Sequence, residues 1–201
     1  METNLDDIRH IRSMMERSSK FLSISGISGV LAGVFATVGA FMAYLVLIKE
    51  FSITGSILYD FIIIAVGVLI FAISGGLLFS ARKAKMNNAK LWTPITLQIA
   101  LDFLIPLGVG GLFCLILIYK HVAYMVAPCM LIFYGLSLVA VGSRTYGDVK
   151  YLGILEIILG LAAAVVVGYD LVFWGIGFGL LHIIYGVVMY YKYDMKSGKN
   201  G

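Results

Sequence analysis

Two ionisable side chains lie deep inside long apolar stretches of the sequence. Asp102 is ten residues into the segment 92–119, and His182 is 11 residues into the segment 171–191. At a helical rise of ~1.5 Å per residue, each lies roughly 15 Å along its segment, close to the middle of a bilayer. An ionisable group at that depth costs several kcal/mol unless it has a partner. Both residues are therefore candidates for binding a proton, an ion or a small solute.

Two further polar residues extend this pair. Gln98 precedes Asp102 by about one helical turn on the same face, and Glu156 matches the depth of Gln98 in the segment 151–168. If the third, fifth and sixth apolar segments pack together, the four side chains form one polar track from the midplane towards one membrane face. Glu156 is expected to be close enough to that face to be hydrated through its flexible side chain.

Two interpretations of the track remain open. In the structural one, Asp102 and His182 form an interhelical pair that holds the bundle together and contributes about 0.6–2 kcal/mol. In the functional one, the track relays a proton or ion, or binds a small polar or cationic solute. His182 is the candidate cationic partner of Asp102, but the sequence does not decide whether the two side chains touch.

The sequence contains no motif that supports enzyme chemistry, a cofactor or a metal. A hydrolase needs a nucleophile within reach of a base, and a metal enzyme needs clustered ligands. The three histidines, His10, His121 and His182, are scattered, which excludes the imidazole set of a non-haem iron oxygenase. Cys114 and Cys129 lie in apolar segments and are expected to be packing residues. We therefore predict that the protein is not an enzyme.

The composition predicts a membrane protein. Of 201 residues, 61% are hydrophobic and only 13% are charged, which is far from the balance of soluble domains. The net charge of +4 does not indicate nucleic-acid binding, because the basic residues cluster beside apolar segments. We expect an all-α bundle of six transmembrane helices over residues 21–191, with the lipid bilayer as its surroundings. The expected spans are 21–48, 57–80, 92–119, 122–142, 151–168 and 171–191.

The two ends of the chain are expected to be cytosolic. Residues 1–20 pair charges at helical spacing and carry apolar residues on one face, so they predict a short amphipathic helix before an uncleaved first span. Residues 192–201 form a cytosolic tail. The amphipathic helix also supports an alternative function, in which the protein is a sensor or partner subunit that acts through residues 1–20.

The distribution of basic residues predicts the orientation. With six spans, 13 of the 15 Lys and Arg residues lie on one side of the membrane, and only Lys49 and Lys120 lie on the other. The side rich in Lys and Arg is the cytoplasmic one. We therefore expect a multi-pass protein of the bacterial inner membrane with both termini in the cytoplasm. Asp60 then lies near the outer interface, where we expect it to be solvated.

Small residues recur along two of the expected spans. Ser25, Gly29 and Gly33 are four residues apart on one helix face, and Gly175 and Gly179 have the same spacing in the last span. Small residues at this spacing let helix backbones approach closely. The pattern predicts close packing either inside the bundle or against a second copy or another membrane protein.

One part of the sequence resembles a known family. The stretch 15–23 reads MERSSKFLS and is followed at 25–29 by SGISG. This stretch resembles the N-terminal signature of an uncharacterised family of bacterial six-helix inner-membrane proteins. The resemblance implies six helices in the inner membrane and carries no activity with it.

Overall fold

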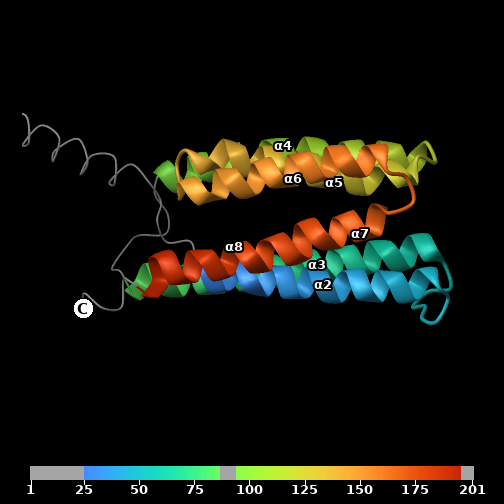
Figure 1. The fold of residues 1–201 in the computed structure, drawn as a ribbon, viewed down its shortest axis with the longest axis horizontal. Coiled ribbons are helices and arrows are strands. Elements are labelled where there is room, and N and C mark those ends of the chain that lie inside the picture. The colour runs from blue at the N-terminus through green and yellow to red at the C-terminus, as the bar shows by residue number, and fades with distance from the viewer. Residues whose placement is uncertain (1–24, 87–93, 196–201) are drawn as a thin grey trace, which may run out of the picture.

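Every element in the described part of the chain is a helix. The computed structural model describes residues 25–86 and 94–195 (Figure 1). The expected cytosolic helix of residues 1–20 and the end of the C-terminal tail lie outside these ranges. The elements are α2 (Gly26–Leu47), α3 (Ile57–Met86), α4 (Pro94–Tyr119), the 3-10 turn η1 (Ala123–Met125), α5 (Val126–Gly142), α6 (Gly147–Val165), α7 (Asp170–Trp174), the π-helix η2 (Gly175–Leu181), α8 (His182–Met189) and the π-helix η3 (Tyr190–Asp194).

Five helices in the described residues are long and apolar enough to cross a membrane. They are α2, α3, α4, the run from η1 through α5, and the run from α7 through η3. The fifth expected span corresponds to α6, which is not among them and which carries Asp148, Lys150 and Glu156 within its 19 residues. The fold is therefore a helical bundle of membrane-protein composition.

The helices form two layers (Figure 1). One layer contains α4, α5 and α6, with α5 packed against both of its neighbours; the other contains α2, α3 and α8, with α2 packed against both. The run from α7 to α8 joins the layers, because α7 and η2 contact α2 as well as α6. The end of the bundle that holds Lys83, Arg144 and Lys192 is here named the basic end. The opposite end carries the loops 48–56 and 166–169.

Glycines bring α2 and the last helical run into backbone contact. A Cβ atom built on Gly33 would lie 2.6 Å from the carbonyl oxygen of Gly179, and one built on Gly186 would lie 2.7 Å from that of Gly26. Gly29 faces the Cα of Gly186, at 3.1 Å from its own ideal Cβ position. The predicted small-residue faces therefore pack against each other inside one chain. Gly175 faces Ala40 more loosely, at 3.4 Å.

Asp194 closes the basic end of this layer. Its Oδ2 accepts hydrogen bonds from the backbone N–H of Gly26 at 2.9 Å and from the Ser25 hydroxyl at 3.3 Å. Its Oδ1 forms a 2.6 Å ion pair with Lys83 of α3. A helix N-terminus has unpaired N–H groups that favour an anion, so Asp194 caps α2 from the far end of the described chain.

The expectation that Asp60 is solvated is wrong. Asp60 is only 1% exposed. Its carboxylate accepts hydrogen bonds from the hydroxyls of Ser52 at 2.7 Å and Thr54 at 2.6 Å, and from the backbone N–H groups of Thr54 at 2.8 Å and Ile53 at 3.2 Å. The loop before α3 folds over the carboxylate and supplies these donors. Asp60 therefore organises the loop at the opposite end.

Candidate functional site

The four predicted site residues form two separate groups. Asp102 pairs with Arg144, whose Nε lies 2.8 Å from Asp102 Oδ2, and the Nη1 of Arg144 donates to Gln98 Oε1 at 3.2 Å. The Asp102 and Arg144 side chains are 35% and 43% exposed. Gln98 and Asp102 thus belong together, as their spacing predicted, but they lie on an accessible face of the bundle.

Asp102 pairs with Arg144 and does not contact His182, whose partners lie elsewhere in the bundle. Arg144 follows the end of α5, the helix on which α4 packs, and its long side chain reaches back along that helix pair. His182 lies instead on the run that packs against α2. The single polar track therefore does not form, since its expected centre, an Asp102–His182 pair, is replaced by two pairs on different helices.

The second group is a buried pair. His182 Nδ1 lies 3.4 Å from Glu156 Oε1, and the two side chains are 7% and 0% exposed. Neither carboxylate oxygen of Glu156 has a hydrogen-bond partner among the described residues. The expectation that Glu156 is hydrated near a membrane face is wrong, because α6 begins at Gly147 and is covered by α5 and α7. Glu156 is in fact the most enclosed acid of the four-residue set.

Both ring nitrogens of His182 have polar neighbours. Nε2 lies 2.7 Å from the Tyr134 hydroxyl, and Nδ1 lies 3.0 Å from the carbonyl oxygen of Gly177 as well as near Glu156. A neutral imidazole that donates from Nδ1 and accepts at Nε2 satisfies both hydrogen bonds. The ring therefore lies between a hydroxyl that is hydrogen-bonded to Nε2 and a carboxylate whose Oε1 is 3.4 Å from Nδ1.

The three side chains meet at the same height in the bundle. Tyr134 is eight residues from either end of α5, Glu156 is nine from either end of α6, and His182 is 12 from either end of the run 170–194. At ~1.5 Å per residue, each is more than roughly 10 Å from a helix end. We name Tyr134, Glu156 and His182 the central cluster.

A π-helical segment shapes the wall of the central cluster. η2 ends at Leu181, directly before His182, and supplies the Gly177 carbonyl that contacts the imidazole. A Cβ atom built on Gly177 would come within 2.5 Å of Glu156 Oε2. Segments of π-helix are rare and often occur at functional sites, because they re-aim backbone and side-chain groups. A methyl group at position 177 would require Glu156 Oε2 and the Leu131 side chain to shift.

The surroundings of the central cluster differ towards the two ends of the bundle. Towards the opposite end, Phe178 packs against both Tyr134 and His182, with ring centroids 5.0 Å and 6.0 Å apart, and Trp174 follows at 5.2 Å from Phe178. Towards the basic end, the side chains packed on the buried Leu138–Met189 cluster include Tyr134, Tyr185 and Tyr193. One side of the cluster is therefore aromatic and apolar, and the other carries hydroxyl groups.

Charged residues lie at the basic end of the bundle, beyond the hydroxyl-bearing side of the central cluster. The Asp148 carboxylate accepts hydrogen bonds from Lys192 Nζ at 2.8 Å and from the Tyr193 hydroxyl at 2.7 Å. Partial burial acts to raise the pKa of Asp148, but these two hydrogen bonds outweigh it, so its pKa is lower than the ordinary value. Tyr146 stacks on Tyr193 at 4.1 Å, and its hydroxyl accepts from Lys83 Nζ at 3.3 Å.

No family model, curated protein or solved structure is significantly similar to this chain. The site therefore has to be interpreted from its own geometry. Within residues 25–86 and 94–195, no three His, Cys, Asp or Glu side chains are grouped so as to hold a metal ion.

Sequence reasoning missed two partners in these groups, Tyr134 and Arg144. Tyr134 carries a signal that could have found it, since it is a hydroxyl-bearing residue halfway along an apolar segment. Arg144 carries none, because it is one of several basic residues beyond a helix end.

Proposed function

We propose that this protein is a membrane-embedded proton-binding bundle in which Glu156 and His182 hold one exchangeable proton. The observation that carries the proposal is the Glu156 carboxylate, which is fully buried, has no hydrogen-bond donor among the described residues and lies 3.4 Å from an imidazole nitrogen. A buried carboxylate of this kind destabilises the folded protein unless its charge is neutralised by a proton or balanced by a cation.

The number of protons on the pair follows from the cost of each charge state. With no proton to share, an ionised Glu156 beside a neutral His182 leaves an uncompensated buried negative charge. With two protons on the pair, a protonated Glu156 beside an imidazolium leaves an uncompensated buried positive charge. A single proton, on either the carboxyl or the ring, keeps the pair neutral overall. The pair is thus suited to take up and release one proton, alone or in exchange with a small cationic solute.

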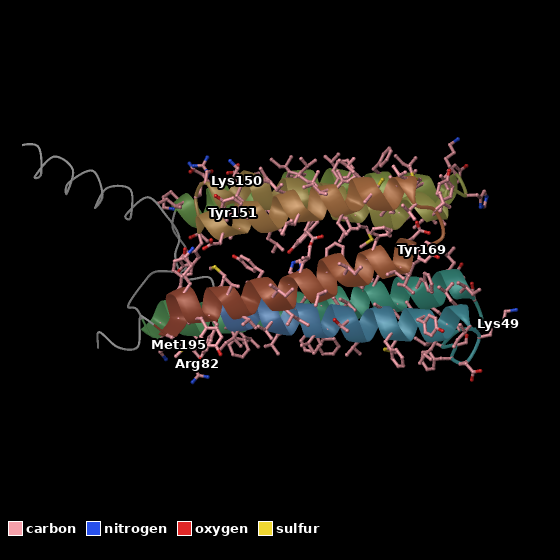
Figure 2. All side chains as sticks on the ribbon, in the orientation of Figure 1. Lys49, Arg82, Lys150, Tyr151, Tyr169 and Met195 are labelled. Atoms are coloured by element: carbon pink, nitrogen blue, oxygen red, sulfur yellow. The ribbon has the colours of Figure 1, made fainter. Side chains whose placement is uncertain are left out.

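We also propose that six helices span the bacterial inner membrane. α6, the fifth in chain order, completes the six spans, because it lies between membrane-length helices and buries its one central charge, Glu156, against His182. The basic end then faces the cytoplasm. In Figure 2, Arg82, Lys150 and Met195 lie at that end, and Lys49 lies at the opposite one. Reporter fusions at Gly201 and in the 81–91 loop should report a cytoplasmic location, and a fusion at Asp170 an external one; an external C-terminus would contradict the topology.

The proton-binding proposal is tested by infrared difference spectroscopy on the full chain in lipid during a pH titration. We expect a carboxylic-acid C=O band, or its exchange for imidazolium bands, that disappears in Glu156→Gln. Asp102→Asn is the matched control, because Asp102 is paired with Arg144 on an accessible face, and it should keep the signal. If no titrating band is lost in Glu156→Gln, the proposal is wrong.

Proton movement is then measured separately in sealed liposomes that contain a pH-sensitive dye. We expect the wild type and Asp102→Asn to dissipate a pH gradient faster than Glu156→Gln. Equal rates in all three, with the infrared signal intact, would show a site that binds a proton without passing it across the membrane.

A further inference from the structure

Tyr185 occupies the gap between the central cluster and the charged basic end. It lies one helical turn from His182 on α8, on the side of the basic end. Its hydroxyl oxygen is buried and has no hydrogen-bond partner among the described residues. A buried hydroxyl without a partner loses its hydrogen bonds to water and gains none within the protein, which destabilises the fold. Its presence there therefore needs a reason other than stability.

The neighbours of Tyr185 belong to both groups that it separates. Its ring packs against the Leu138–Met189 cluster together with those of Tyr134 and Tyr193. Tyr146 belongs to that cluster, and Asp148 accepts a hydrogen bond from the Tyr193 hydroxyl. Lys192 and Lys83 lie one step further out, bonded to Asp148 and Tyr146. The hydroxyl-bearing side chains of Tyr193, Tyr185 and Tyr134 therefore border one apolar cluster between the basic end and His182.

Among the residues that the structure describes, the contacts of the central cluster towards the opposite end are aromatic or apolar. On that side the central cluster is covered by Phe178 and Trp174, and by the apolar side chains of Leu131 and Leu159 that pack around Gly177. These groups have no hydroxyl or carboxyl that could carry a proton. The two sides of the cluster thus differ in the chemistry that proton transfer needs.

We propose that Tyr185 is a proton-transfer residue that connects the Glu156–His182 pair with the basic end, so that the pair exchanges its proton faster with that end than with the opposite one. This inference rests on the proposed proton-binding function. It assigns Tyr185 a role as an intermediate hydroxyl between Tyr134 on one side and the Asp148–Tyr193 group on the other.

Each transfer in this series conserves protons. When Glu156 is ionised, the Nδ1 proton of His182 leaves its hydrogen bond to the Gly177 carbonyl and moves to the carboxylate, whose Oε1 lies 3.4 Å from Nδ1. Nε2 then takes the proton of the Tyr134 hydroxyl, to which it is already hydrogen-bonded. The Tyr185 hydroxyl has no hydrogen-bond partner among the described residues, so its side chain must move towards Tyr134 to return a proton there, and towards the Asp148–Tyr193 group, which exchanges with water at the basic end, to regain one. The imidazole changes tautomer, and the net result is one proton moved from the aqueous side to Glu156.

The test follows the protonation of Glu156 after a pH jump applied to one side of sealed vesicles that contain the full chain in one orientation. Time-resolved infrared absorption of the Glu156 band is the readout. We expect a fast response when the jump is on the side of the basic end and a response slower by on the order of tenfold or more when it is on the other side. In Tyr185→Phe the fast response should slow by a similar factor, because the ring stays and only the hydroxyl is lost.

Tyr191→Phe is the matched control, since Tyr191 is 63% exposed on η3 and faces away from the series. It should respond at the wild-type rate. Equal rates from both sides, or an unchanged rate in Tyr185→Phe, would overturn the role of Tyr185 while leaving proton binding intact. Absence of any Glu156 band in the wild type would instead reject the proposed function itself. Thermal unfolding of each variant identifies a slow response that is due only to misfolding.

Discussion

Gly177 and Glu156 are in such close contact that an added methyl group at position 177 would lie 2.5 Å from Glu156 Oε2. The buried position of the carboxylate beside His182 thus depends on the absence of a side chain on the facing helix. We predict that Gly177→Ala lowers the free energy of unfolding by about 1–3 kcal/mol, the usual cost of overpacking a filled interior. The infrared band of Glu156 should shift in the same variant, because the carboxyl group must move.

The control for this substitution is Gly111→Ala. Gly111 lies in α4 with open space where its Cβ would be. Alanine is a better helix former than glycine by about 1 kcal/mol, so this variant should be neutral or more stable. A Gly177→Ala protein as stable as Gly111→Ala would show that the contact is not tight.

The separation of the two polar groups predicts which substitutions interact. Glu156→Gln and His182→Leu should be non-additive in a double-mutant cycle, with a coupling of about 0.5–3 kcal/mol, since each residue alone leaves the other buried without its partner. The measurement is unfolding in mixed detergent micelles for the wild type, the two single variants and the double variant. Additive effects would place the two side chains apart.

Asp102→Asn provides the comparison for that cycle. Combined with His182→Leu it should be additive within about 0.5 kcal/mol, because Asp102 is bonded to Arg144 instead. Combined with Arg144→Gln it should be non-additive by about 0.5–3 kcal/mol, because the two side chains form a 2.8 Å ion pair. A strong Asp102–His182 coupling would contradict the arrangement described above.

The all-helical architecture could be predicted because it follows from apolar segment length, a property that is local in the sequence. The small-residue faces were also identifiable, since Gly29 and Gly33 share a face at helical spacing and a face of this kind has to meet another backbone. The ends of the helices were harder to predict from the sequence than their existence. α3 continues to Met86, six residues past the expected end at 80, because its last residues are good helix formers despite their charge.

The composition of the site could be predicted only in part. Counting residues from a helix end gives the height of Glu156 or His182 in the bundle, but not the direction in which either side chain points. The pairing depends on that direction, and it is set by which helices are neighbours. The Asp102–Arg144 contact could not be predicted for a second reason. The long side chain of an arginine at a helix end can extend several residues back along the bundle.

Backbone contact between α2 and α8 gives a prediction about packing. Gly186→Ala should destabilise the protein by about 1–3 kcal/mol or more, since the added methyl group meets backbone atoms of Gly26, Gly29 and Val30 that cannot rotate away. Gly76→Ala in α3 is the control, because nothing lies within 4 Å of its ideal Cβ position. The assay is thermal unfolding in detergent, with size-exclusion chromatography to follow the oligomer. Equal stability of the two variants would rule out the tight contact.

The lowered pKa of Asp148 predicts a dependence of stability on pH. A carboxyl group whose pKa is lower in the folded protein than its ordinary value of 3.8 stabilises the fold above that value, and the contribution is lost as the pH falls through the folded pKa. Wild type should therefore lose thermal stability more steeply than Asp148→Asn when the pH is lowered from about 5 to about 3. Parallel curves for the two proteins would show that the hydrogen bonds from Lys192 and Tyr193 do not stabilise the fold.

The cap that Asp194 places on α2 orders events during synthesis. Gly26 is synthesised 168 residues before Asp194, so its N–H waits for its acceptor until every described helix has been made. The same carboxylate binds Lys83, so the contacts that join the start of α2 and the end of α3 to η3 can form only after η3 has been made. A chain that stops at residue 193 keeps α2 to α8 yet lacks the carboxylate that joins the start of α2 to the last helical run.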